Sequence, residues 1–224
     1  MQLGNRVLVL APHPDDEVLG VGGTIARFAA EGAEIYIAIL TKGYPPAFDN
    51  KSVRRARSEA VAAGIALGAR KTIFLSLPAA ALDTVAHRKI NARLVELYQA
   101  THPDVLFIPF NGDIHLDHQR IFHSALVACR PNSVGRPKSI YAYETLSESN
   151  WNAPYLTPGF SPNVFVDISE HLEKKLKAMR LYRSQLKSFP HERSLETIRA
   201  LALLRGSTAG CSAAESFVLV RQVI

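Results

Sequence analysis

Short apolar runs alternate with longer amphipathic stretches along most of the chain. Residues 6–11 (RVLVLA) and 34–40 (EIYIAIL) are rich in aliphatic side chains, as expected for strands buried on both faces of a parallel sheet. Between them, residues 18–31 carry apolar side chains at helical spacing and stop at Gly32, which favours the end of a helix. This part of the chain therefore predicts a strand, a helix and a second strand.

The same alternation continues toward the C-terminus. The pattern predicts helices over residues 53–67, 84–100 and 170–186, and strands over residues 72–75, 104–109, 164–168 and 217–223. Strands that alternate with helices are typical of an α/β fold with a doubly wound sheet. We predict a Rossmann-like three-layer αβα sandwich with a mostly parallel sheet, and a single domain over residues 1–224, because no repeat or long linker divides the chain.

Composition and charge exclude several classes of protein. With 47% hydrophobic and 21% charged residues, the chain has the composition of a globular protein. No apolar run approaches the roughly 20 residues that cross a bilayer, and the first residues lack the apolar stretch of a signal peptide. We therefore predict a cytoplasmic protein without a membrane span. The formal charge of +6 is spread without a polybasic tract, which argues against a nucleic-acid partner.

Two clusters of histidine and aspartate follow two of the predicted strands. Residues 12–17 (PHPDDE) come directly after the first strand, and residues 111–118 (NGDIHLDH) come after the strand at 104–109. In open α/β sheets, sites lie outside the C-terminal strand ends, where the strand order reverses. If the order is Rossmann-like, these two strands are neighbours, and the clusters face each other across one crevice.

These clusters contain ligands that suit a catalytic zinc ion, which takes three protein ligands and leaves a fourth position open. We predict His13, Asp16 and His118 as the three ligands, and the two prolines beside His13 restrict its backbone. Cys129 and Cys211 are too few and too far apart for a thiolate site. Imidazole and carboxylate must therefore hold any metal.

Three further residues of the clusters predict amide hydrolysis. Asp15 can act as general base beside the metal. A protonated His115 can stabilise the tetrahedral oxyanion, and Asp117 can orient His115 or raise its pKa. Taken alone, the first cluster can also be a turn in which aspartates cap a helix. The second cluster at another strand end favours the catalytic interpretation.

The two strings, PHPDDE and HLDH, together resemble the PIG-L/LmbE-like family of zinc deacetylases, which act on N-acetylglucosaminyl substrates. The resemblance spans most of the chain and implies a Rossmann-like fold. It also implies zinc on His13, Asp16 and His118, a general base at Asp15, and His115 as the group that stabilises the oxyanion or donates a proton. Relatives commonly form symmetric assemblies, so a homo-oligomer is expected.

One departure from the family concerns substrate binding. Relatives often place an arginine three residues before the glutamate that matches Glu59, and here that position is Ala56. Arg55 and Arg57 flank it, and we predict that one of them contacts the substrate. A solvated helix face explains these basic residues equally well.

We therefore predict a zinc-dependent hydrolase that removes an N-acetyl group from an N-acetylglucosaminyl sugar or conjugate. One alternative is a metal-dependent phosphoesterase, because adjacent aspartates at a strand end also suit magnesium. Another is a metal- or glycan-binding protein without catalysis, which would not need Asp15 or His115. The segments at 44–51 and 147–162 are predicted to rim the crevice.

Overall fold

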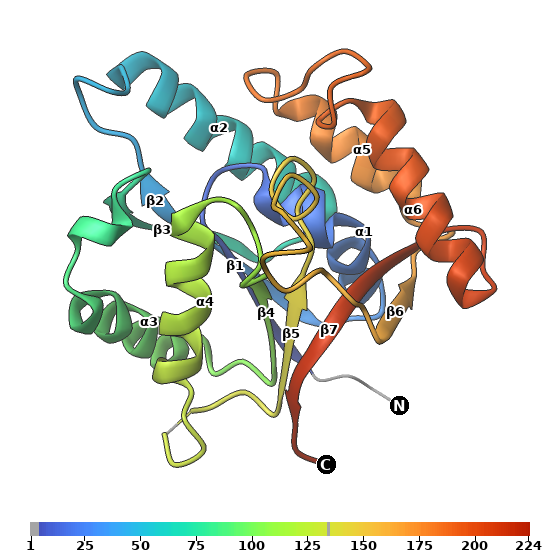
Figure 1. Cartoon of the computed structure of the whole chain (residues 1–224). Helices are drawn as coiled ribbons and strands as arrows, with labels where there is room; N and C mark the ends of the chain where they lie inside the picture. Colours follow the sequence, from blue (N-terminus) through green and yellow to red (C-terminus); the bar gives the residue numbers. More distant parts are fainter. Residues whose placement is uncertain (1–4, 134) are drawn as a thin grey trace.

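A seven-stranded sheet forms the centre of the computed structural model, which describes residues 5–133 and 135–224 (Figure 1). The strands are β1 (Arg6–Ala11), β2 (Glu34–Lys42), β3 (Lys71–Pro78), β4 (Val105–Pro109), β5 (Ser139–Tyr143), β6 (Val164–Asp167) and β7 (Ala214–Gln222). Their order in the sheet is β3-β2-β1-β4-β5-β7-β6. The first five strands run parallel, whereas β7 is antiparallel to β5 and to β6. The predicted α/β fold with a mostly parallel sheet is confirmed.

Helices cover both faces of this sheet. They are α1 (Asp16–Ala30), α2 (Asn50–Leu67), α3 (His87–Thr101), α4 (Leu116–Ala128), α5 (Leu172–Leu181) and α6 (Leu195–Ala209). Helices α1, α2, α5 and α6 pack on one face, and α3 and α4 pack on the other (Figure 1). Within the described ranges, no helix is both long and apolar enough to cross a membrane.

Strand β1 shows why the sequence pattern was informative. Val7 and Val9 belong to the core under α1 and α2, while Leu8 and Leu10 belong to the core under α3 and α4. A strand that is buried on both faces needs apolar residues at nearly every position. The predicted strand over residues 6–11 therefore has the bounds that the structure shows.

Strand β5 and helix α6 were missed, and one predicted helix was too long. Strand β5 has only five residues, and α6 exposes Leu203 and Leu204 while Ile198 is buried, so neither has a clear period. The helix predicted over residues 170–186 ends at Leu181. Beyond that point the chain turns away, and Ser184 donates hydrogen bonds to Glu59 of α2. A tertiary contact thus ends the helix where its sequence pattern would continue.

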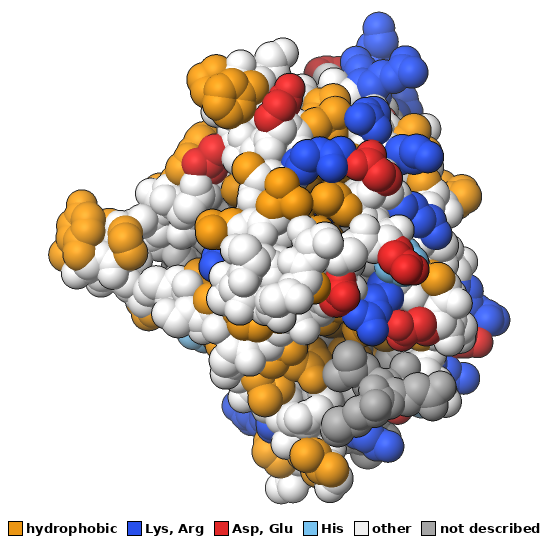
Figure 2. Space-filling model, turned by 90° about the vertical axis from the view of Figure 1, so that its right-hand side faces the viewer, with side chains coloured by type: hydrophobic (Ala, Val, Ile, Leu, Met, Phe, Trp, Pro, Cys, Tyr) orange, Lys and Arg blue, Asp and Glu red, His pale blue; other side chains and the backbone are white. Residues whose placement is uncertain are grey.

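The view in Figure 2 shows how charge is distributed on one face. Acidic side chains are interspersed among the lysine and arginine side chains, and hydrophobic side chains stand out on a projection at the left. This face agrees with the scattered charge expected from the sequence. The absence of a nucleic-acid partner stays a prediction.

A buried ion pair joins α1, α5 and β7. Lys175 Nζ lies 2.6 Å from Glu215 Oε1 and donates to the carbonyl oxygen of Leu19 at 2.8 Å. The Glu215 carboxylate accepts the main-chain N–H groups of Gly23 and Thr24. Leu19 and Gly23 are four residues apart, one turn of α1, so the ion pair contacts main-chain groups in the middle of this helix. It fixes the helix whose first turn carries the acidic cluster.

We expect Lys175→Ala to lower the free energy of unfolding by about 3–5 kcal/mol, because it leaves the Glu215 carboxylate buried and unpaired. Urea denaturation measures this difference. Lys177→Ala removes an exposed lysine of the same helix and should change it by less than about 0.5 kcal/mol. Equal stability of the two variants would contradict the role of the ion pair.

Candidate metal centre and active site

The C-terminal ends of β1 and β4 bring the two predicted clusters together. The strands are parallel neighbours in register, with Val7 beside Val105 and Val9 beside Phe107. The chain leaves β1 through residues 12–15 into α1, and leaves β4 through residues 110–115 into α4. The ring centroids of His13 and His118 lie 5.4 Å apart. The expected crevice between these strands is therefore present.

The three predicted ligands form one compact group. Ligand atoms of His13, Asp16 and His118 all lie within 4.8 Å of one another. Asp16 Oδ2 is 3.4 Å from His13 Nδ1 and 3.2 Å from His118 Nε2. His118 and Asp16 are buried, while His13 is partly open to the cavity. Two imidazoles and one carboxylate thus converge on one point that a ligand can reach.

Each of the two histidines is held from behind by a carboxylate. His118 Nδ1 lies 2.7 Å from Asp113 Oδ2, and His13 Nε2 lies 3.0 Å from Asp117 Oδ2. Carboxylates commonly hold metal-binding histidines in this way and leave the other ring nitrogen free for the ion. His118 Nε2 is buried and has no hydrogen-bond partner among the described residues. A metal ion bound here would give this nitrogen a partner, so the residues of the group are suited to bind a metal.

The electrostatics of the group also favour a positive charge. Burial lowers the pKa of His118, but the charge of Asp16 and the hydrogen bond to Asp113 outweigh it and hold the pKa well above its ordinary value. Burial likewise lowers the pKa of His13, and hydrogen bonds to Asp117 and Asp16 outweigh it and raise the pKa to about 9. Carboxylates that stabilise a proton here also stabilise a cation.

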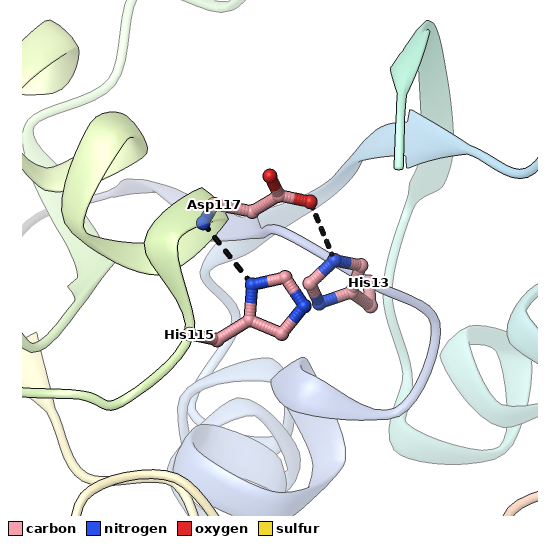
Figure 3. A group of neighbouring side chains, drawn as sticks. All are labelled: His13, His115 and Asp117. Carbon is pink, nitrogen blue, oxygen red and sulfur yellow. Dashed lines mark hydrogen bonds and ion pairs between the residues drawn. The ribbon is translucent and has the colours of Figure 1, made fainter. Parts of the chain in front are cut away.

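The position of Asp117 differs from the one that we predicted (Figure 3). Its carboxylate contacts His13 and accepts the main-chain N–H groups of Ala80 at 2.7 Å and Leu82 at 3.1 Å. Only the main-chain N–H of Asp117 reaches His115, donating to Nδ1 at 3.1 Å. The carboxylate therefore positions the predicted metal ligand His13. Its effect on His115 is the second of the two that we expected, because its charge raises the pKa of His115 against the larger effect of burial.

His115 is the N-cap residue of α4, and its ring lines the cavity. Because Nδ1 accepts a hydrogen bond, the neutral ring carries its proton on Nε2. Burial and the nearby charge of His13 lower the pKa of His115. The structure thus favours a neutral imidazole with an Nε2–H donor, in place of the protonated ring that we expected.

Asp15 lies in the cavity wall with a strained backbone. Its φ of 111° is rare for a residue with a side chain, and Glu17 accepts its main-chain N–H at 3.2 Å. Burial raises the pKa of Asp15 to about 7, and the charge of Arg193 at 3.3 Å opposes this rise. Strained positions cluster at functional sites. Ser76, Ala80 and Ser147, which bond to residues of this site, also have positive φ.

A cavity of about 280 Å³ opens beside the metal-binding group. It lies near the lower end of the ~300–1,000 Å³ typical of small-molecule sites. Its lining comprises His13, Pro14, Asp15, Asp16, Thr41, Lys42, Gly43, Phe48, Ser52, Val53, Ala56, Arg57, Ala79, Ala80, His115, Glu148, Gln185 and Arg193. Residues of both clusters thus face the same space as residues of β2 and α2.

The two candidate arginines lie in different places. Arg57 lines the cavity, whereas Arg55 is outside it, with a side chain that is 55% exposed and pairs with Glu59 at 3.0 Å. Of the segments expected to rim the crevice, residues 44–51 contribute Phe48 and residues 147–162 contribute Glu148 to the lining. The aromatic residues Tyr44, Trp151 and Tyr155 of these two segments are exposed and lie outside the lining.

Comparison with known proteins identifies the family. The sequence model described as PIG-L, GlcNAc-PI de-N-acetylase, matches residues 8–129, a little over half of the chain. The chain belongs to the PIG-L family. This confirms the resemblance that the PHPDDE and HLDH strings carried.

One relative is a diacetylchitobiose deacetylase of Thermococcus kodakarensis. The chain is 27% identical to it, over 96% of the chain and 83% of that protein. The crystal structure of an N,N'-diacetylchitobiose deacetylase of Pyrococcus horikoshii superposes with a TM-score of 0.75 at 25% identity, and covers 97% of the chain and 84% of that protein. A 4-carboxy-2-hydroxymuconate hydratase of Pseudomonas putida has the same fold, with a TM-score of 0.79 at 24% identity and 98% coverage of each chain. This shared fold therefore supports more than one named reaction.

Two residues of this PIG-L site were not assigned from the sequence. Asp113, within the second string, holds His118, and its other oxygen accepts a hydrogen bond from Ser149 at 2.5 Å. Arg193 lies between α5 and α6 and contacts Asp15, Ser147 and other residues from distant segments. The sequence did offer a signal for Asp113, because this carboxylate lies in the same string as the predicted ligand His118, five residues before it. Nothing local in the sequence indicated Arg193.

We expect Asp113→Ala to weaken zinc binding by about 10–100-fold, the usual effect of removing a carboxylate that holds a metal ligand. Competition with a zinc chelator measures the dissociation constant. Asp104→Ala is the matched control, because Asp104 precedes the same strand at its other end and accepts the main-chain N–H groups of Asn5 and Arg6. Equal zinc affinity in wild type and Asp113→Ala would contradict this role.

Proposed function

We propose that this protein hydrolyses the N-acetyl amide of an N-acetylglucosaminyl sugar or conjugate, with a zinc ion held by His13, Asp16 and His118. The observation that carries the proposal is the convergence of these three side chains in a cavity that also exposes Asp15. The named activities of the deacetylase relatives support the same reaction and substrate class.

The donor set favours zinc over harder ions. Magnesium and calcium prefer oxygen ligands, whereas two imidazoles with one carboxylate suit zinc. Three protein ligands are also the usual number at a catalytic zinc site. When bound, the ion supplies Lewis acidity, which polarises the amide carbonyl and lowers the pKa of water.

Asp15 takes the role of general base in this proposal. Its carboxylate lines the cavity directly before Asp16, within the same short loop as His13. A buried carboxylate with a raised pKa is a stronger base than an exposed one. Asp15 accepts a proton from the attacking water as the carbon–oxygen bond forms. Arg193 holds this carboxylate at 3.3 Å and limits its movement.

His115 supplies a hydrogen-bond donor for the carbonyl oxygen of the amide. Its Nε2–H can donate to the oxygen on which negative charge develops, because Nδ1 is occupied by the main-chain N–H of Asp117. When the carbon–nitrogen bond breaks, the leaving amine takes up a proton. The carboxylic acid of Asp15 can donate it, because Asp15 took up the proton of the attacking water in the first step. The products are acetate and the free amine of glucosamine.

Release of acetate together with free amine tests the proposal. Zinc-loaded protein is incubated with the methyl glycoside of N-acetylglucosamine and with N,N'-diacetylchitobiose, and both products are quantified. The expected result is one amine for each acetate. Phosphate release from an aryl phosphate without acetate release would favour the phosphoesterase instead. Zinc binding without either product would favour a binding protein.

Three earlier predictions need measurements of their own. The cytoplasmic location and the single-domain organisation stay predictions. So does the homo-oligomer, which sedimentation of the purified chain would test.

A further inference from the structure

Glu17 is a fully buried carboxylate that belongs neither to the metal-binding group nor to the cavity lining. It follows Asp16 in the first turn of α1, and within the described ranges no lysine or arginine pairs with it. A carboxyl group buried without a cation is costly, because hydrogen bonds offset its lost hydration only in part. An apolar side chain of similar size would fill the same space at less cost. A role beyond packing is therefore expected of Glu17.

Both carboxylate oxygens of Glu17 accept hydrogen bonds, and these bonds connect two distant segments. Oε2 accepts the main-chain N–H of Asp15 at 3.2 Å, and Oε1 accepts the hydroxyl group of Tyr182. Tyr182 directly follows α5 and is fully buried. The Tyr182 hydroxyl group thus fixes the Glu17 side chain against the residue that precedes the metal ligand Asp16.

The backbone of Asp15 needs such a contact, because its conformation is strained. With φ at 111° and ψ at −24°, Asp15 adopts a conformation that is rare for a residue with a side chain. Its carbonyl oxygen accepts the main-chain N–H groups of Val18 and Leu19 at 3.0 and 2.9 Å, while its own N–H is held by Glu17. A change of φ would turn the Asp15 side chain and move the carboxylate that lines the cavity.

Tyr182 is also connected to the carboxylate of Asp15. The Tyr182 carbonyl oxygen accepts the main-chain N–H of Gln185 at 3.0 Å, and Gln185 Oε1 accepts Arg193 Nη1 at 3.3 Å. The same Nη1 donates to Asp15 Oδ2 at 3.3 Å. Hydrogen bonds thus form a closed ring that begins at the Asp15 main chain and returns to the Asp15 carboxylate. This ring fixes the side chain of Asp15 relative to its own backbone.

We propose that Glu17 and Tyr182 are positioning residues, which hold Asp15 in the conformation that a general base requires. The inference rests on the proposed function and extends it to two buried residues outside the cavity. Misplacement of a base slows the proton transfer and leaves the binding of substrate nearly unchanged. Loss of the Tyr182 hydroxyl group should therefore lower kcat at constant KM.

Tyr182→Phe removes only this hydroxyl group, and steady-state kinetics of acetate release by the zinc-loaded protein measure the effect. We expect kcat to fall about 10–100-fold, the effect of displacing a reacting group by about 1 Å, with KM and zinc content within about twofold of wild type. Glu17→Gln keeps the size of the side chain but loses one of the two acceptor oxygens, and it should lower kcat to a similar extent.

Tyr36→Phe is the matched control, because the Tyr36 hydroxyl group also donates to a carboxylate, that of Glu34 at 3.2 Å. Both residues lie at the start of β2, whereas the cavity is lined by residues at its end. Tyr36→Phe should keep the kcat of wild type. A kcat of Tyr182→Phe equal to that of wild type would overturn the inference.

A double-mutant cycle separates positioning of Asp15 from a general loss of structure. In the Asp15→Asn background, Tyr182→Phe should lower the residual kcat less than about twofold, because the group through which Tyr182 acts is already lost. A further fall of about 10–100-fold in that background would show that Tyr182 acts independently of Asp15, which also overturns the inference.

Crystal structures of zinc-loaded wild type and Tyr182→Phe test the same inference without turnover. In the variant, the Asp15 carboxylate should leave its place beside Arg193, or the φ of Asp15 should become negative. An Asp15 that keeps its place in Tyr182→Phe would overturn the positioning role, even where wild type releases acetate. A displaced Asp15 together with a wild type that releases no acetate would keep the positioning role and overturn the deacetylase.

Discussion

His118→Ala should abolish stoichiometric zinc binding and lower kcat/KM for acetate release by at least about a thousandfold. Two features of the structure give His118 this weight. Its ring is fully buried, and Asp113 fixes its Nδ1. Its Nε2 lies 3.2 Å from Asp16 Oδ2 and has no hydrogen-bond partner within the described ranges. A catalytic metal supplies several kcal/mol of transition-state stabilisation, which corresponds to a factor of this size.

His123→Ala is the control for this variant, because His123 is an exposed histidine on the same helix. It should keep both zinc and activity. Thermal unfolding of both metal-free proteins shows whether His118→Ala still folds. A folded His118→Ala that retains one zinc ion and wild-type activity would refute the ligand assignment.

The second large effect is expected for Asp15→Asn, which should lower kcat by about 10²–10⁴-fold, the usual contribution of a general base. Zinc content and KM should change little, because Asp15 does not belong to the ligand group. Asparagine has nearly the same shape and tolerates positive φ better than most residues, so the strained turn can persist. Steady-state kinetics of acetate release and metal analysis measure both properties.

Asp167→Asn provides the comparison for Asp15→Asn. Asp167 is an exposed aspartate at the end of β6 that bonds to Ser169. Its substitution should leave kcat unchanged. If Asp15→Asn turned over at the wild-type rate with zinc bound, another group would have to be the base.

The central part of the fold could be predicted because burial on both faces leaves a strong pattern. Strands β1 and β2 were found with nearly correct bounds, since most side chains in them are apolar. The order of the sheet around β1 and β4 followed from the Rossmann-like interpretation. Strand β5 and helix α6 were missed, because a five-residue strand and a helix with exposed leucines do not show a clear period.

The metal-binding group could be predicted because its residues follow two strands that end at the same place. His13, Asp16 and His118 needed only that adjacency to converge. The contacts of Asp117 and Arg193 could not be predicted in the same way. The Asp117 carboxylate is directed by the main-chain N–H groups of residues 80 and 82, and Arg193 by Asp15 and Ser147 of two distant segments. Such contacts depend on the tertiary structure and leave no local pattern.

Removal and return of zinc tests the account most directly. The purified chain is treated with a chelator, dialysed, and titrated with zinc, while bound zinc and acetate release from an N-acetylglucosaminyl glycoside are measured on the same samples. The account predicts that acetate release disappears with the metal and returns in proportion to bound zinc, up to one ion per chain. Full acetate release from the metal-free chain would contradict it.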